Sequence, residues 1–435
     1  MRKFLYSVLM LAAVVLAACS NDDNGDTQPK RGMILNASVE NLSSRATMTD
    51  ESGTWKFAFT QNDKVSVSNN KISSYYTFTN NGSQFTSTDA MVTTEAADWY
   101  AYFPGNKVDL TNQTGTFADV ANKFAVAGKT AQTTTGEKGL SVTLKSKVAV
   151  LRVVAVDKKG ILDINVKTTA DDKWVKGLTA TKNAAEFTVS TSDTKTTLLH
   201  KAAGEVQAGE INYVVVPAGE KIAIYNGDLL LNTTKTGLTE GKYYTITSGP
   251  TKGTETATLA NGTTETVEWV QLWAGGPRIA TQNVAEEMTW TDAAKTGSDY
   301  VWGANWHTPT ADEVTEKGGF LAEWNTKEGK WVVKEGSPTI NVTKKDGTEE
   351  TVVFTGVQPG YTKNTLTLYN KIDSHGYSHF NFWTTTENNG YGCMYRIMID
   401  DGIIGIFGNS PFESKNTKCY VRPVLSIQNI TNNPK

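Results

Sequence analysis

The sequence predicts a mainly β protein with two small β-sandwiches, followed by a separate mixed α/β domain. Short runs of Val, Ile, Tyr and Phe alternate with polar residues and are separated by Gly, Asn and Asp, which is typical of antiparallel strands. These runs fall into two groups of about six or seven, a number that suits a small sandwich. Beyond residue 251 the composition changes, because eight of the eleven tryptophans lie there.

Length and charge limit the partners that the protein can have. A chain of 435 residues is long enough for about two to four domains. Its net charge of −3 argues against nucleic acid as a partner, because that interaction needs a surplus of Lys and Arg.

Residues 1–18 have the pattern of a bacterial lipoprotein signal peptide. Arg2 and Lys3 precede an apolar run that is short for a bilayer span and ends in Leu-Ala-Ala before Cys19. This pattern predicts that Cys19 becomes the first residue of the mature protein and carries the lipids, palmitate among them. Two or three acyl chains would hold the protein on outer-membrane lipid, since each buried methylene contributes about 0.8 kcal/mol. The alternative is an ordinary secretory signal in which Cys19 has no role.

The first sandwich is expected over residues 32–145, after a polar, lipid-anchored tether at 19–31. Its first strand places Met33, Leu35, Ala37 and Val39 at alternate positions, as a half-buried strand requires. A break of small polar residues, which contains Arg45 and Ala46, follows this strand.

The second sandwich is expected over residues 146–248. Its first run, VAVLRVVAV, is apolar almost throughout and predicts a strand that is covered on both faces. Residues 249–263 are rich in Gly and Thr and poor in large apolar groups, so we interpret them as a linker. The third domain then spans 264–428, with a tail at 429–435. Thr310 and Glu313 have the spacing of a capping box and predict a helix start.

Several segments before residue 248 resemble the Bacteroidetes fimbrillin family, the subunits of type V pili. They are Ser44-Arg45-Ala46, WKFAF, KVSVS, WYAYFP, VAVLRVVAV and GLTEGKYYTIT. The resemblance implies two tandem transthyretin-like β-sandwiches. It also implies cleavage between Arg45 and Ala46, removal of the strand that carries Met33 to Val39, and donor-strand addition by another fimbrial subunit. The alternative for Arg45 is a surface arginine without such a role. Ser20 to Asp23 resemble the surface-export signal of lipoproteins in the same phylum.

The third domain resembles the Fibrobacter-type major paralogous domains, which are related to C-type-lectin-like folds. The resemblance rests on VQLWAGGPRIATQNVA, WGANWHTPTADEV, FTGVQPGY, NFWTTTENN and YVRPVL. It implies a mixed α/β domain in which Trp273, Trp306, Trp383 and Arg422 belong to the framework.

The sequence offers little chemistry for catalysis, and we expect neither an enzyme nor a cofactor. His375 and His379 have the HxxxH spacing of a zinc site, but Gly, Tyr and Ser between them indicate a loop, so no metal site is predicted. Cys393 and Cys419 could form one disulfide or remain buried thiols.

Aromatic residues in the loops of the third domain are the candidate ligand contacts, because loops on a rigid scaffold often carry binding residues. They are Tyr361, Tyr369, Tyr377 and Phe380.

These patterns together predict a surface-exposed outer-membrane lipoprotein. The first interpretation is an adhesin, as a minor, tip or accessory component of type V fimbriae, whose third domain recognises a host or bacterial surface glycan or protein. The alternative is a surface glycan-binding lipoprotein for polysaccharide capture, in which the sandwiches act as a spacer.

Overall fold

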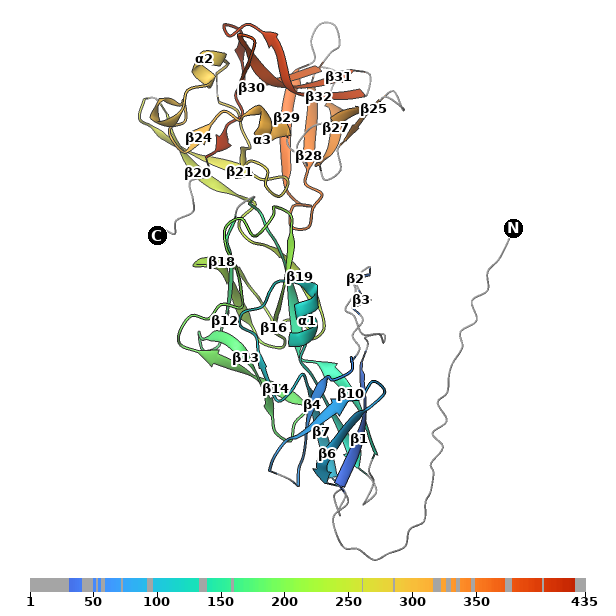
Figure 1. The fold of residues 1–435 in the computed structure, drawn as a ribbon. Coiled ribbons are helices and arrows are strands. Elements are labelled where there is room, and N and C mark those ends of the chain that lie inside the picture. The colour runs from blue at the N-terminus through green and yellow to red at the C-terminus, as the bar shows by residue number, and fades with distance from the viewer. Residues whose placement is uncertain are drawn as a thin grey trace, which may run out of the picture.

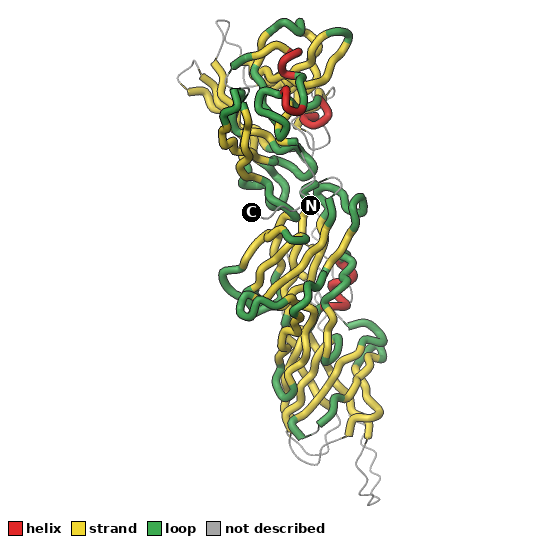
Figure 2. The backbone as a smooth tube through the Cα atoms, turned by 90° about the vertical axis from the view of Figure 1, so that its left-hand side faces the viewer, coloured by secondary structure: helices red, strands yellow, loops and turns green. Residues whose placement is uncertain are grey.

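The structure, a computed structural model, describes all residues except 1–30, 41–49, 52–53, 56–58, 72, 92–96, 133–138, 158–159, 260, 285, 316–321, 326–329, 334–336, 346–348, 372–377, 401–402 and 427–435. The fold is mainly β, and three β-rich units lie end to end in an elongated molecule (Figure 1, Figure 2). Within the described residues, no helix combines the length and apolar character needed to cross a bilayer.

Seven strands of the first unit close on one another as a barrel. In spatial order they are β1 (Arg31–Val39), β10 (Gly139–Ser146), β9 (Val126–Gln132), β7 (Ala97–Phe103), β4 (Lys64–Asn69), β5 (Tyr76–Asn80) and β6 (Phe85–Met91). The ring closes because β1 pairs with β10 on one side and with β6 on the other. The seven described strands of the expected β-sandwich therefore close into a barrel, and each of them has a neighbour on both sides. A small hairpin, β2 (Asp50–Glu51) and β3 (Thr54–Trp55), lies apart from it.

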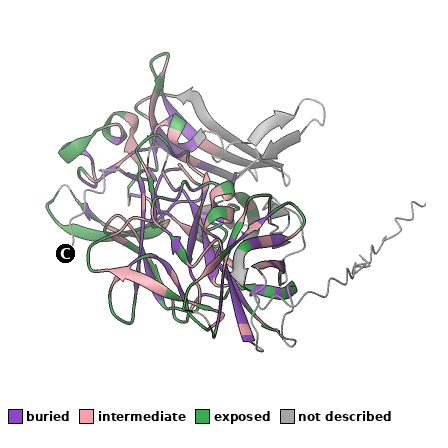
Figure 3. Ribbon diagram, turned by 60° about the horizontal axis from the view of Figure 1, so that its bottom comes forward, coloured by how far each residue is buried: buried purple, intermediate pink, exposed green. Residues whose placement is uncertain are grey.

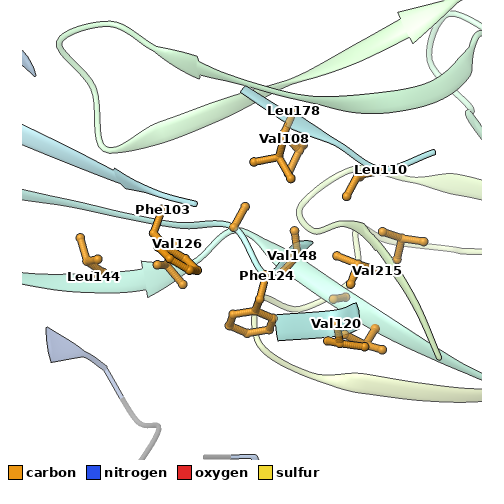
Figure 4. Close-up of a cluster of buried hydrophobic side chains, with 14 of the residues drawn as sticks. Phe103, Val108, Leu110, Val120, Phe124, Val126, Leu144, Val148, Leu178 and Val215 are labelled. Carbon is orange, nitrogen blue, oxygen red and sulfur yellow. The ribbon is translucent and has the colours of Figure 1, made fainter. Parts of the chain in front are cut away.

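The chain leaves the first unit after β7 and returns at β9, and the segment between them belongs to the second unit. There β8 (Lys107–Asp109) pairs with β13 (Trp174–Thr181), and α1 (Phe117–Lys123) packs against β16 (Ile211–Pro217). The predicted first domain, 32–145, therefore needs a correction, because the segment 107–123 within it belongs to the second unit. The physical reason is that the apolar residues of this segment, among them Val108, Leu110 and Val120, complete the second core (Figure 4).

Two sheets form the second unit. The larger contains, in spatial order, β14 (Glu186–Ser192), β13, β12 (Leu162–Thr168), β17 (Ile222–Asn226) and β18 (Leu229–Thr233), with β8 paired to β13 and β15 (Leu199–Lys201) to β12. The smaller holds β11 (Val148–Val154) between β16 and β19 (Tyr243–Thr247). Every residue of β11 except Arg152 is buried, which confirms the prediction of a strand covered on both faces.

One cluster of buried apolar side chains extends through both units, from Met33 in β1 to Leu238 before β19. Figure 4 shows the place where the units meet, with Phe103 and Val126 on one side and Val148 and Leu178 on the other. Because the core is continuous, the two units form one packed body and not two independent domains.

The residues predicted as a linker, 249–263, instead contain a strand. β20 (Lys252–Thr258) pairs antiparallel with β21 (Thr264–Val270) along its whole length. Ala257 of β20 and Val267 of β21 are fully buried, and the other residues of β20 are mostly exposed. Threonine favours extended backbone because its branched Cβ restricts χ1, so a Thr-rich segment can form a strand without large apolar groups.

The third unit is mixed, as expected, but its helices are short. They are α2 (Trp290–Ala293), the 3-10 helix η1 (Gly297–Asp299) and α3 (Ala311–Thr315). A five-stranded sheet has the order β20, β21, β22 (Ile279–Ala280), β34 (Val424–Leu425) and β24 (Trp306–His307). Two-stranded ladders join β23 (Met288–Thr289) to β33 (Lys418–Cys419) and β25 (Ala322–Asn325) to β26 (Lys330–Val333). Two three-stranded sheets complete the unit: β27 (Thr339–Lys345), β28 (Glu349–Thr355) and β29 (Thr365–Lys371), and β30 (Ser378–Asn388), β31 (Tyr391–Asp400) and β32 (Ile403–Glu413).

The residues predicted to form the framework of the third unit are buried. Trp273, Trp306 and Trp383 are each at most 2% exposed, and Arg422 is 7% exposed. Figure 3 shows buried residues along the strands and exposed residues along many of the outer loops and turns. The two clusters inside this unit contain no residue of the first two units, so its core is separate.

Candidate functional site

The candidate site is the position of β1 in the first barrel. β1 runs parallel to β10, with Leu35 beside Leu140 and Val39 beside Leu144, and antiparallel to β6, with Leu35 beside Phe85. In Figure 1, β1 lies next to β6 and β10 at the end of the molecule that is farthest from the third unit. Both neighbours would have a free hydrogen-bonding edge if β1 were absent.

The alternate residues of β1 point into the barrel, as the sequence pattern predicts. Met33 and Leu35 are each 1% exposed, while Ala37 and Val39 are half-buried and pack against the same core. The facing residues of β10, Leu140, Val142 and Leu144, are also buried. Strand β1, the candidate removable strand, therefore lies in an apolar groove between β10 and β6.

Backbone geometry and one ion pair mark the ends of this strand. At its start, Gly32 has φ of 91°, and the register with β6 shifts by two residues between Arg31 and Met33. Such a bulge suits glycine, which tolerates positive φ. At its end, the Glu40 amide donates to the Leu144 carbonyl at 2.8 Å, and the Glu40 carboxylate lies 3.0 Å from Lys145 Nζ. Cys19, Arg45 and Ala46 lie outside the described residues.

The free energy that keeps β1 in the barrel comes from its two buried side chains and from its hydrogen-bonded pairing with β10 and β6. Full burial of a Leu or Met side chain contributes about 1.5–3 kcal/mol, so Met33 and Leu35 together contribute roughly 3–6 kcal/mol. A closed barrel has no free edge, whereas a barrel without β1 has two edges beside an apolar slot. Such a slot favours the entry of any extended chain with matching alternation.

Two of the four aromatic residues proposed as ligand contacts are buried. Tyr361 is fully buried, and its hydroxyl donates to Gln271 Oε1 at 3.3 Å. Phe380 is 3% exposed, inside an apolar cluster. Neither ring has a face for a ligand, so these two assignments are corrected. The side chain of Tyr369 on β29 and the whole of Tyr377 lie outside the described part of the chain.

Two other aromatic residues of the third unit are exposed and were missed. Tyr391 is 49% exposed and Tyr420 is 43% exposed. Tyr391 directly follows Asn389 and Gly390, whose φ values of 52° and 84° form the tight turn between β30 and β31. An Asn-Gly pair between alternating strands is a strong hairpin signal, so the sequence could have placed Tyr391 at a hairpin tip.

The cysteines are buried thiols and do not form a disulfide. Cys393 lies on β31, whereas Cys419 lies on β33, which pairs with β23. Burial, together with the nearby charge of Glu387, raises the pKa of the Cys393 thiol. A thiol with a raised pKa is a poor nucleophile, so the geometry gives Cys393 a packing role.

The expected capping box at α3 is present. The Glu313 amide donates to Thr310 Oγ1 at 3.1 Å, and the Thr310 amide donates to the Glu313 carboxylate at 2.7 Å. His307 lies between this helix and the last strand, with Nε2 3.0 Å from Glu313 and Nδ1 2.9 Å from Ser426 Oγ. Burial alone would raise the pKa of Glu313, but the hydrogen bonds from His307 and Thr310 outweigh it, and the pKa is lowered.

The HxxxH motif does not lie on a helix over its described part. His379 lies on the strand β30, paired with Met398, and His375 lies outside the described residues. Among the residues that the structure describes, no three His, Cys, Asp or Glu side chains come together as a metal site.

The third unit is joined to the second by a packed junction. Tyr361 packs with Val154 and Val156, and the Gly275 amide donates to the Val156 carbonyl at 2.7 Å. Arg278, which is 4% exposed, places a guanidinium nitrogen 3.7 Å from the Asp157 carboxylate. These contacts fix the orientation of the third unit on the second.

Comparisons with known proteins find weak similarity to solved structures only. No family model matches the chain, and no curated protein sequence matches it. A cell adhesion protein of provisional description from Bacteroides ovatus is 9% identical with a TM-score of 0.32, over 55% of this chain and 96% of that one. A fimbrial protein from Bacteroides ovatus is 12% identical with a TM-score of 0.26, over 92% of this chain and all of that one. A fimbrial assembly protein from Parabacteroides distasonis is 12% identical with a TM-score of 0.25, over 55% of this chain and 95% of that one. Scores this low do not assign a function.

Proposed function

We propose that this protein is a cell-surface lipoprotein adhesin that acts as a minor, tip or accessory component of type V fimbriae. The observation that carries the proposal is the position of β1 between β10 and β6. One strand at the N-terminal end closes the barrel, and its inward residues Met33 and Leu35 fill a groove between two ladders. A cut after Arg45 would separate this strand from the rest of the barrel and open the groove to a donor strand.

The third unit supports a terminal position and not a repeating one. β34 lies between β22 and β24 in the five-stranded sheet, and Val424 and Leu425 are buried. Withdrawing β34 as a donor would dismantle that sheet. β19 is likewise held, because it pairs with β11 and leads directly into the packed junction with the third unit. Such a subunit can accept a strand but has no described strand that is free to be donated.

The third unit would then be the recognition module, held away from the groove by the second unit. The exposed rings of Tyr391 and Tyr420 favour contact with a surface glycan, because aromatic faces stack on sugar rings. This feature also suits the alternative function, a glycan-binding lipoprotein for polysaccharide capture. Association with fimbriae separates the two functions.

Mass spectrometry of the mature N-terminus from native cells tests the proposal. We expect a fraction of the protein to begin at Ala46, and the Arg45→Ala variant to lack that fraction. Arg31→Ala is the matched control, because cleavage after Arg31 would leave β1 in the chain. Immunogold labelling of the wild type should give sparse label at fibre ends. Dense, regular label along fibre shafts, or an N-terminus that remains at Cys19 in fibre preparations, would contradict the proposal.

A further inference from the structure

A groove lies along one edge of the second unit, beside its junction with the third. Its walls are formed by β18, by β19, by the segment 249–252 that follows β19, and by Gly360 of the third unit. Its volume is about 400 Å³, within the range of about 300–1,000 Å³ that is usual for binding sites. This β18–β19 groove differs from the β1 groove, because no strand has to leave in order to expose it.

Both strands of this groove are the outermost strands of their sheets. In the part of the chain that the structure describes, β18 pairs only with β17, and β19 pairs only with β11. The Ser248 amide, just after β19, donates to the Val154 carbonyl of β11 at 2.9 Å. Successive residues of a strand direct their backbone groups to opposite sides. Thr245 and Thr247 therefore direct theirs away from β11, and both residues line the groove.

The opposite edge of the same small sheet is closed by the chain itself. The outermost strand there is β16, and Gln113 Nε2 donates to the Val215 carbonyl at 2.9 Å while the Val215 amide donates to Gln113 Oε1 at 2.7 Å. The Tyr213 amide donates to the Gly115 carbonyl at 2.9 Å. No described segment pairs with the outer edge of β19 in this way, so that edge is available to a strand from another molecule.

The strands β18 and β19 lack the residues that usually prevent an edge strand from pairing. Such strands are typically protected by charged side chains or proline, whereas Leu229–Thr233 and Tyr243–Thr247 contain neither. β18 has three consecutive leucines, and Leu230, which lines the groove, is 51% exposed. Exposed leucine beside free backbone edges favours the addition of an extended chain with apolar side chains.

The end of the groove at the junction is positively charged. Lys252 lines the groove. The Asn364 side-chain amide donates to the Thr251 carbonyl at 3.4 Å, so Lys363, the residue before Asn364, is near the same end. Within the described residues neither lysine forms an ion pair, and no Asp or Glu lines the groove. A carboxylate on a bound chain would therefore meet an unpaired cation at this end.

The lining favours a peptide over a sugar. Among the described residues that line the groove there is no aromatic ring, so it lacks the faces on which sugar rings stack. Its free hydrogen-bonding groups are instead backbone amides and carbonyls with the spacing of a strand, and these match the backbone of another strand.

We propose that the β18–β19 groove binds an extended, acidic segment of another protein. The segment would pair with the free edge of β19 through Thr245 and Thr247, place apolar side chains against the leucines of β18, and bring a carboxylate to Lys252. This proposal rests neither on cleavage after Arg45 nor on the fimbrial assignment, because the groove is present with β1 in the barrel.

Selection from a phage-displayed library of random heptapeptides on the purified full chain, followed by hydrogen exchange, tests the site. We expect the selected peptides to combine alternating apolar residues with at least one Asp or Glu. As synthetic peptides, they should slow the exchange of the Thr245 and Thr247 amides. The exchange of the Val215 amide should not change, because it is already bonded to Gln113.

Substitutions in β19 and at Lys252 separate the backbone contribution from the charge. Thr245→Pro should weaken binding of a selected peptide roughly tenfold, because it removes one backbone donor. Proline is tolerated in an edge strand where the lost N–H faces outward. Thr245→Val is the matched control, because it keeps the amide and the branched Cβ, and it should bind as the wild type does. Lys252→Glu should weaken binding, and a peptide whose acidic residue is replaced by Lys should bind this variant better than the wild type.

Three results would overturn the proposal. They are selected peptides that do not protect the Thr245 and Thr247 amides, basic or uncharged peptides that bind as tightly as acidic ones, and undiminished binding by folded Thr245→Pro. Protection of the same amides by an oligosaccharide of galacturonic acid, but by no peptide, would assign the groove to a sugar and would also overturn it. The exchange pattern of the wild type decides the matter even if Thr245→Pro does not fold.

Discussion

Weakening β1 should open the groove of the first barrel without unfolding the rest of the molecule. The most informative change is Leu35→Ala, because Leu35 is 1% exposed and lies between Phe85 of β6 and Leu140 of β10. A buried Leu→Ala substitution costs about 2–5 kcal/mol, since it removes apolar contacts and leaves a cavity. If β1 leaves the barrel as a unit, this cost lowers the free energy of strand release by the same amount. The population of the open form should then rise roughly 30- to 4,000-fold.

Hydrogen exchange of the backbone amides measures this opening directly. The amides that β10 and β6 donate to β1 should exchange faster in Leu35→Ala by the factor given above. Amides of the β11 and β16 ladder in the second unit should keep their protection, because that ladder does not contact β1. A synthetic peptide with the sequence of β1 should then bind the variant more tightly than the wild type.

Asn36→Ala is the matched control, because Asn36 is the next residue of the same strand and is exposed. It should change neither the exchange rates nor the binding of the peptide. If Leu35→Ala accelerates exchange equally in β10 and in the β11 ladder, the barrel and the second unit open together. The idea of a separately releasable strand would then be wrong.

Three further changes test other parts of the structure. Cys19→Ser should release the protein from membranes, and its presence in detergent-free outer-membrane fractions would disprove lipid anchoring. Gly360→Val should lower the thermal midpoint by several degrees, because Gly360 has φ of 83° and an added Cβ would collide with Thr247 across the junction. Gly262 has φ of 80°, but nothing lies near its missing Cβ, so Gly262→Ala should lower the midpoint less. Glu313→Gln should lower the stability of the protein above pH 4.5, the ordinary pKa of a Glu side chain. The stability difference between variant and wild type should disappear as the pH falls through the lowered pKa of Glu313 in the folded state. Urea unfolding midpoints that differ by a constant amount between pH 3 and 6 would refute this.

Local patterns predicted the parts of the fold that depend on neighbouring residues. The alternation in β1 and the continuous apolar run of β11 both have the burial that the sequence indicates. The capping box at Thr310 and Glu313 forms with both of its hydrogen bonds. Each of these features depends only on residues within one strand or one helical turn. A single sequence therefore contains enough information to predict them.

Long-range pairing could not be predicted in the same way. Val108 and Leu110 belong to the second core, although the residues on both sides of the segment belong to the first barrel. Which core this segment joins depends on its pairing with β13, about 70 residues later in the chain. The strand β20 was missed because its buried side chain is an alanine and its other positions are mostly Thr and Glu.

The positions of the groove and the third unit favour independence of the proposed strand exchange from the proposed recognition. The β1 groove lies at one end of the molecule and the third unit at the other (Figure 1). The two N-terminal units share one core, and the junction holds the third unit through Arg278, Tyr361 and the Gly275 amide. A donor strand in the groove would replace β1 within the same two ladders, so it has no evident means of changing the surface around Tyr391. The affinity of the third unit for its ligand should therefore be the same before and after cleavage at Arg45. A measured difference would require a second conformation of the shared core or of the junction.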